Sequence, residues 1–130
     1  MDLESFIGKM VGPFEFEAQG TRIEAFCEAV GSRATPVGAP PTFLTVCRQG
    51  EFELLTQMGI ALSQVLHGEQ EYVTPEAVLP GDCLSYSTRL GQAIEKKIGT
   101  FLVFETEVKT QRSEKMIIVG TARTTIVVRG

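Results

Sequence analysis

The chain contains 130 residues, of which 43% are hydrophobic and 22% are charged, so its composition predicts one globular domain over residues 1–130. A formal net charge of −4 argues against a protein that binds nucleic acid. The sequence has no run of about 18 apolar residues, which a membrane-spanning helix needs, so no membrane contact is expected.

The three cysteines are widely spaced, and the chain contains a single histidine. This set fits neither a zinc site nor a disulfide framework, so we expect reduced thiols and no metal or cofactor. The acidic start of the chain, from Met1 to Glu4, lacks the basic region and apolar core of a signal peptide. Together these features predict a cytoplasmic protein.

The first third of the chain predicts one strand, one helix and a loop. Residues 14–17 alternate between apolar and acidic side chains, which is typical of a half-exposed strand. Apolar residues within 21–30 recur at helical spacing, and Gly31 follows them as a C-terminal cap. Residues 32–41 contain three prolines and predict a loop.

Residues 42–58 predict a central helix that is either short or broken. Gly50 lies in its middle, and a glycine inside a helix costs about 1 kcal/mol relative to alanine. The apolar residues of this segment recur nearly all round the helix, which indicates that it is buried. Its large apolar side chains are Phe43, Leu44, Cys47, Phe52, Leu55 and Met58.

From residue 64 onward the hydrophobic pattern changes to that of strands. The predicted strands cover residues 64–73, 83–91, 101–111 and 116–128, and short turns join the last three. Three sequential strands joined by short turns form an antiparallel meander, and residues 42–58 are the natural cover for its inner face. The sequence therefore predicts an α+β fold, in which one antiparallel sheet curls around a central helix.

The only histidine, His67, is a candidate acid or base, and Glu69 is its candidate carboxylate partner. A simpler interpretation is that His67 anchors a turn through hydrogen bonds. The strand periodicity also predicts that Glu69 and Glu71 point to one side while Gln70 points to the other.

Three segments carry a resemblance to a known family. They are Ala39-Pro40-Pro41-Thr42-Phe43, then Leu66-His67-Gly68-Glu69-Gln70 followed by Pro80-Gly81-Asp82, and the last forty residues. Their order and spacing resemble the hot-dog fold of the MaoC-like dehydratases. The chain is similar to the N-terminal halves of double hot-dog (R)-specific enoyl-CoA hydratases, including the peroxisomal multifunctional enzyme, and to the first subunit of mycobacterial-type dehydratases.

The sequence departs from this family at the catalytic motif. Catalytic members carry an Asp-x-Asn-Pro-x-His-like motif after the first helix, which supplies the acid and base that hydration needs. Here Ser32 stands in place of the aspartate, Arg33 follows it, and no histidine comes next. Neither side chain supplies that chemistry at neutral pH, because arginine stays charged and serine is a very weak acid.

The resemblance therefore implies a subunit that binds an acyl-CoA or acyl-ACP thioester and pairs with a second hot-dog chain carrying the catalytic residues. The pair would be an (R)-specific enoyl-CoA or enoyl-ACP hydratase or a 3-hydroxyacyl dehydratase. In similar proteins the acyl tail lies beside the shortened central helix, so the six apolar side chains of residues 42–58 are the predicted acyl-binding set.

Two alternatives stay open at this stage. One is a homodimeric hydratase or thioesterase that uses His67 and Glu69, and the other is an acyl-CoA-binding module with no activity. Because exposed strand edges invite pairing, we also expect a dimer in which two hot-dog sheets join edge to edge. The apolar final strand suits burial at that seam through Ile117, Ile118, Val119, Ile126, Val127 and Val128.

Overall fold

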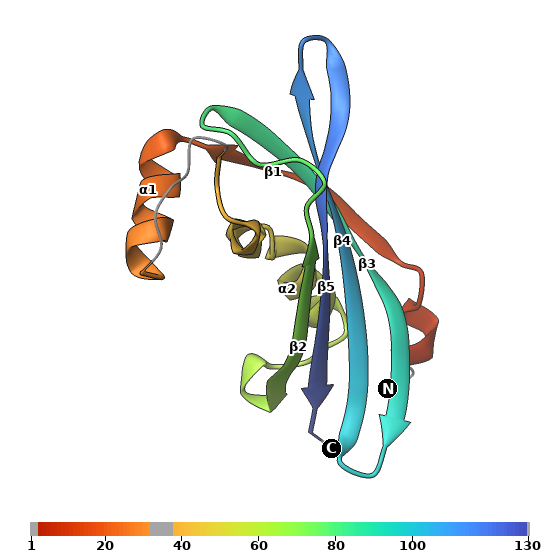
Figure 1. Ribbon diagram of the computed structural model, residues 1–130. Coiled ribbons are helices and arrows are strands. Elements are labelled where there is room, and N and C mark those ends of the chain that lie inside the picture. The colour runs from red at the N-terminus through yellow and green to blue at the C-terminus, as the bar shows by residue number, and fades with distance from the viewer. Residues whose placement is uncertain (1–2, 32–37, 130) are drawn as a thin grey trace.

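A computed structural model describes residues 3–31 and 38–129 of the chain (Figure 1). It contains five strands, two α-helices and three short 3₁₀ turns, labelled η, in the described ranges. In chain order the elements are η1 (Leu3–Phe6), β1 (Met10–Ala18), α1 (Gly20–Ala29), η2 (Pro41–Val46), α2 (Gln49–Gln57), η3 (Leu62–Gln64), β2 (Val65–Val73), β3 (Asp82–Lys96), β4 (Gly99–Arg112) and β5 (Lys115–Val128).

The five strands form one sheet in the order β1-β3-β4-β5-β2, and every neighbouring pair is antiparallel. Strands β3, β4 and β5 are the predicted meander, and α2 packs across one face of the twisted sheet (Figure 1). The predicted α+β arrangement of a sheet around a short central helix is therefore confirmed. No helix in residues 3–31 or 38–129 is long and apolar enough to cross a membrane.

The apolar side of α2 fills the space inside the sheet. Leu54 and Met58 are fully buried there, and they pack with Leu90 of β3, Phe104 of β4 and Ile126 of β5. Burial of each such side chain stabilises the fold by about 1.5–3 kcal/mol relative to exposure. This cluster fixes α2 against the three central strands.

The central helix is interrupted, but the prediction that Gly50 breaks it is wrong. The chain makes a 3₁₀ turn up to Val46, changes direction at Cys47 and Arg48, and then forms α2, with Gly50 inside its first turn. A Cβ atom on residue 50 would stand 2.3 Å from Oγ1 of Thr88 on β3. Glycine is needed at this position because the helix backbone approaches the sheet closely.

The final strand does not form an edge of the sheet, contrary to the expectation from its apolar sequence. β5 lies between β4 and β2, and the free edges belong to β1 and β2. Its apolar residues have a different explanation, since Val119, Ile126 and Val128 are buried against the helical side. Any seam with another sheet therefore has to form at β1 or β2.

Candidate functional site

The sole histidine lies on the edge strand β2, next to an irregularity at Gly68. His67 stands opposite Ile126 of β5, and Glu69 stands opposite Thr125, the adjacent residue. Two steps along β2 thus match one step along β5, which defines a β-bulge at Gly68. Because directly opposed residues share a face of the sheet, His67 lies on the inner face with the buried Ile126, and Glu69 lies on the outer face.

The bulge therefore separates the two candidate catalytic residues. His67 shares the inner face with Gln70, and its Nε2 atom lies 3.3 Å from Oε1 of Gln70. Glu69 and Glu71 share the outer face, as the strand periodicity predicts. The structure thus gives His67 an amide neighbour and does not bring it together with Glu69 as an acid–base pair.

A buried carboxylate that the sequence analysis overlooked lies behind this strand. Glu51, in the first turn of α2, is only 2% exposed. Its Oε1 accepts hydrogen bonds from Arg48, at 3.0 Å from Nη2, and its Oε2 accepts one from Oγ1 of Thr124 at 2.9 Å. A negative charge is also favoured in the first turn of a helix. These contacts explain how the carboxylate is accommodated inside the protein.

The same threonine continues the hydrogen bonding to the edge strand. Oγ1 of Thr124 lies 2.8 Å from Oε1 of Gln70, which in turn contacts the ring of His67. Arg48, Glu51, Thr124, Gln70 and His67 form a polar chain from α2 through β5 to β2, here called the edge network. It connects a buried charge to an exposed histidine on a free sheet edge. The same segment also carries Arg48 and Glu53, so the sequence contains no signal that distinguishes Glu51 as a buried carboxylate.

The six predicted acyl-binding side chains do not line one surface. The core cluster beside α1 and β1 contains Phe43, Leu44 and Cys47. The cluster beneath α2 contains Leu55 and Met58, whereas Phe52 is exposed. Phe52 is 43% exposed, and the guanidinium of Arg48 lies 5.3 Å from the centre of its ring. Within this set of six, only Phe52 offers apolar surface that a ligand can reach without movement of the chain.

Two of the three cysteines, Cys27 and Cys47, are buried, and Cys83 is exposed. Burial raises the pKa of Cys47 to about 12, so its thiol stays protonated and is a poor nucleophile at neutral pH. Among residues 3–31 and 38–129 no three His, Cys, Asp or Glu side chains gather to hold a metal ion. Ser32 and Arg33, at the position of the family's catalytic motif, lie outside the described residues.

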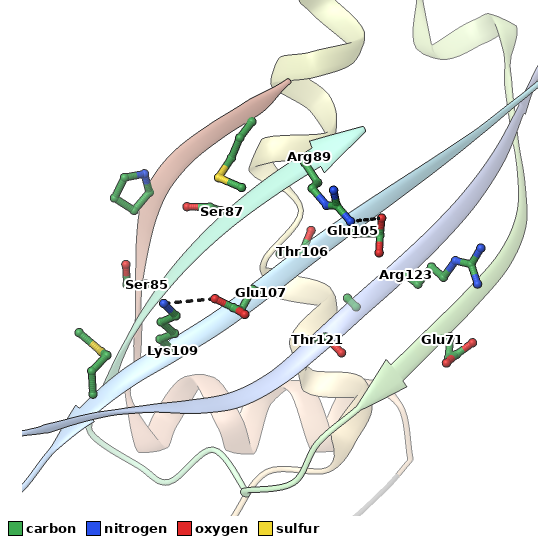
Figure 2. A pocket seen from close by; sticks show the side chains of 14 residues that line it. Glu71, Ser85, Ser87, Arg89, Glu105, Thr106, Glu107, Lys109, Thr121 and Arg123 are labelled. Atoms are coloured by element: carbon green, nitrogen blue, oxygen red, sulfur yellow. Dashed lines mark hydrogen bonds and ion pairs between the residues drawn. The ribbon is translucent and has the colours of Figure 1, made fainter. Parts of the chain in front are cut away.

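The outer face of the sheet carries an open hollow of about 880 Å³ (Figure 2). Polar and charged side chains of β3, β4 and β5 project into it. Arg89 pairs with Glu105 at 3.0 Å, and Lys109 pairs with Glu107 at 3.2 Å. None of the six predicted acyl-binding residues lines this hollow. Its paired charges suit a solvated surface better than an apolar tail.

The chain is similar to known proteins over nearly its whole length. The family described as "FAS1-like, dehydratase domain region" matches residues 5–119. A "UPF0336 protein" of Saccharopolyspora erythraea is 28% identical over 145 aligned positions, which cover 98% of this chain and 91% of the relative.

Two solved structures share the fold. One is the C-terminally truncated HadBC (3R-hydroxyacyl-ACP dehydratase) complex of Mycobacterium tuberculosis, with a TM-score of 0.75 and 18% identity over 93% of this chain and 96% of that chain. The other is a MaoC-like dehydratase from Rhodospirillum rubrum, with a TM-score of 0.63 and 19% identity over 100% of this chain and 98% of that chain. At these identities the likeness establishes the fold.

Proposed function

The chain belongs to the FAS1-like dehydratase domain-region family and has the hot-dog fold, and on this basis we propose that it is the acyl-thioester-binding subunit of an (R)-specific hydratase or dehydratase. Its substrate is an enoyl or 3-hydroxyacyl group carried on CoA or on an acyl carrier protein. A second hot-dog chain supplies the catalytic Asp and His, and no cofactor takes part.

The environment of His67 is the observation that carries the proposal. Hydration of an enoyl thioester needs a base for water and an acid for the α-carbon. The only histidine of the chain contacts an amide, and among the described residues no carboxylate bonds to it directly. This supports a chain that contributes to binding and leaves the proton transfers to a partner.

The free edge of β2 supports pairing with another sheet. β2 bonds to β5 on one side, and no other described strand lies on its second side. A row of unpaired backbone groups is a template for a strand from another chain. Val73 is 54% exposed on this strand, and its apolar surface favours such a contact. The similar HadBC structure is also that of a complex.

The acyl group is proposed to enter beside Phe52. This ring is the exposed member of the predicted set, and Leu55 and Met58 lie deeper on the same helix. Access to these two buried side chains requires α2 to move away from the sheet. Phe43, Leu44 and Cys47 complete the set on the preceding segment, where they are now packed within the core.

The test is turnover by the chain alone and by a reconstituted pair. The purified chain should not hydrate crotonyl-CoA or crotonyl-ACP, and it should do so once mixed with a hot-dog chain that carries the Asp and His motif. Comparison of the two substrates identifies the carrier. Turnover by the chain alone would contradict the proposal.

A second candidate is a homodimeric hydratase or thioesterase that uses His67 with Glu51 behind it, because Glu69, the carboxylate predicted from the sequence, lies on the opposite face of the sheet. The observation that favours it is the edge network, because it connects His67 to the buried carboxylate of Glu51 through two hydrogen-bonding side chains. Turnover by the chain alone that disappears in His67→Ala would support this candidate.

A further inference from the structure

The edge network contains a conflict at Thr124. Its hydroxyl group lies 2.9 Å from Oε2 of Glu51 and 2.8 Å from Oε1 of Gln70. Both neighbours are acceptors in this orientation of the amide, but a hydroxyl carries only one hydrogen. One of the two short contacts would then join two oxygen atoms with no hydrogen between them.

A half-turn of the Gln70 amide resolves the conflict. The oxygen and nitrogen of a glutamine amide are assigned from their hydrogen bonds, because the two atoms are otherwise nearly indistinguishable. After the turn, Thr124 donates to the carboxylate of Glu51, which is the stronger, charge-assisted bond, and the amide nitrogen donates to Thr124. The turn gives up the hydrogen bond that the amide nitrogen of Gln70 donates to the carbonyl oxygen of Arg123 at 3.3 Å. The two oxygens that then face each other there repel more weakly than two oxygens at 2.8 Å, because they lie farther apart.

This arrangement determines which nitrogen of His67 carries the proton. The amide NH₂ group donates one hydrogen to Thr124 and presents the other to Nε2 of His67. Nε2 must then accept, so a neutral His67 carries its proton on Nδ1. Free imidazole side chains prefer the opposite tautomer. We propose that Glu51 is a positioning residue that holds His67 as the Nδ1–H tautomer through Thr124 and Gln70.

The role of this tautomer in substrate binding rests on the proposed function. With Nε2 held by Gln70, Nδ1–H is the group that His67 offers at the edge of the sheet, and no described residue bonds to it. A fixed N–H donor at a seam suits an acceptor oxygen of the substrate, such as the thioester carbonyl. The histidine then binds an oxygen and does not remove a proton.

The single histidine makes the inference directly measurable. With ¹⁵N-labelled histidine, a long-range ¹H–¹⁵N correlation spectrum of the isolated chain at pH 9, where imidazole is neutral, reports the tautomer of this one residue. The ratio of the Nδ1–H form to the Nε2–H form in the wild type should be about five-fold higher than in free imidazole, the change that one net hydrogen bond supplies. Thr124→Ser, which keeps the hydroxyl, should preserve that ratio, and Glu51→Gln should lower it to that of free imidazole or below.

Two further variants provide controls. Thr124→Val keeps the shape of the side chain and removes the hydroxyl, so it should return the ratio toward that of free imidazole even if Glu51→Gln does not fold. Glu69→Gln removes a charge two residues away on the outer face and should change nothing. A wild-type ratio equal to that of free imidazole, or one unaffected by both Glu51→Gln and Thr124→Val, would overturn the inference. Because no partner or substrate is present, this failure is distinct from failure of the hydration assay.

Discussion

Gly50 of α2 and Thr88 of β3 lie so close together that a Cβ atom on residue 50 would stand 2.3 Å from the threonine hydroxyl oxygen. That hydroxyl is itself buried and hydrogen-bonded to Thr106 of β4 at 2.8 Å. The threonine has little freedom to move, because its rotation would break this bond. The contact therefore sets how deeply the central helix sits in the sheet.

Gly50→Ala should destabilise the protein. Overpacking a core costs about 1–3 kcal/mol, and at such a short contact it exceeds the gain of about 1 kcal/mol that alanine brings to a helix. Urea denaturation measures the change in the free energy of unfolding. Gly20→Ala is the control, because its Cβ would meet only Pro80, at an ordinary 3.7 Å. Equal stability of Gly50→Ala and wild type would contradict the role of this contact.

The buried thiol of Cys47 should make stability fall at high pH. Burial raises its pKa in the folded state from 9.0 to about 12, so its contribution is complete below pH 9 and is lost as pH rises toward 12. In this window the unfolded state releases the proton while the folded state keeps it. Compared with Cys47→Ala, the wild type should lose up to about 1.4 kcal/mol more per pH unit. Parallel pH profiles of the two proteins in denaturation experiments would contradict this account.

The ion pair between Arg112 and Asp82 should matter more than the pair between Lys109 and Glu107. Asp82 is nearly buried and also accepts a hydrogen bond from the backbone of Leu79 at 2.8 Å. Asp82→Asn should cost about 1–3 kcal/mol, less than for a fully buried pair, because Arg112 is 23% exposed. Glu107→Gln is the matched control and should change stability by at most about 0.5 kcal/mol. Denaturation curves in which both variants lose the same stability would refute the distinction.

The proposed pairing along β2 predicts a homodimer of the isolated chain. Light scattering at micromolar concentration should give about twice the 14.2 kDa mass of one chain. Val73→Lys should weaken the dimer about ten-fold or more, since lysine on an edge strand opposes pairing. Met116→Lys, on the β4–β5 hairpin, replaces another exposed apolar residue and should leave the dimer intact. A clean 14.2 kDa species of the wild type would exclude this mode of association.

Periodicity in the sequence predicted the strands and the buried helix, because alternation and helical spacing are local properties. Contacts between residues far apart in the sequence are not visible in such patterns, and the wrong predictions concern these contacts. The order of strands in the sheet puts β5 inside it, so its apolar residues cover a core and not a seam. In the sequence alone Gly50 resembles a helix breaker, whereas in the fold it allows α2 to approach Thr88 closely.

The candidate site was predicted less completely, for the same reason. The bulge at Gly68 reverses the face of Glu69 relative to His67. A glycine inside a strand is compatible with a bulge, but the alternation of side chains does not show that one residue is extra. Glu51 was overlooked because an acidic residue on a helix is usually solvated. Its partner Thr124 lies 73 positions away, so only the folded chain shows that the carboxylate is buried and hydrogen-bonded.

The central claim is that this chain binds the thioester while a partner chain performs the chemistry, and the kinetics of the reconstituted pair test it most directly. His67→Ala in this chain should mainly raise KM for crotonyl thioester and lower kcat by less than about ten-fold, because it removes a binding contact. Substitution of the catalytic histidine in the partner chain should abolish kcat. The opposite pattern, in which His67→Ala abolishes kcat and the partner's histidine is dispensable, would contradict the account.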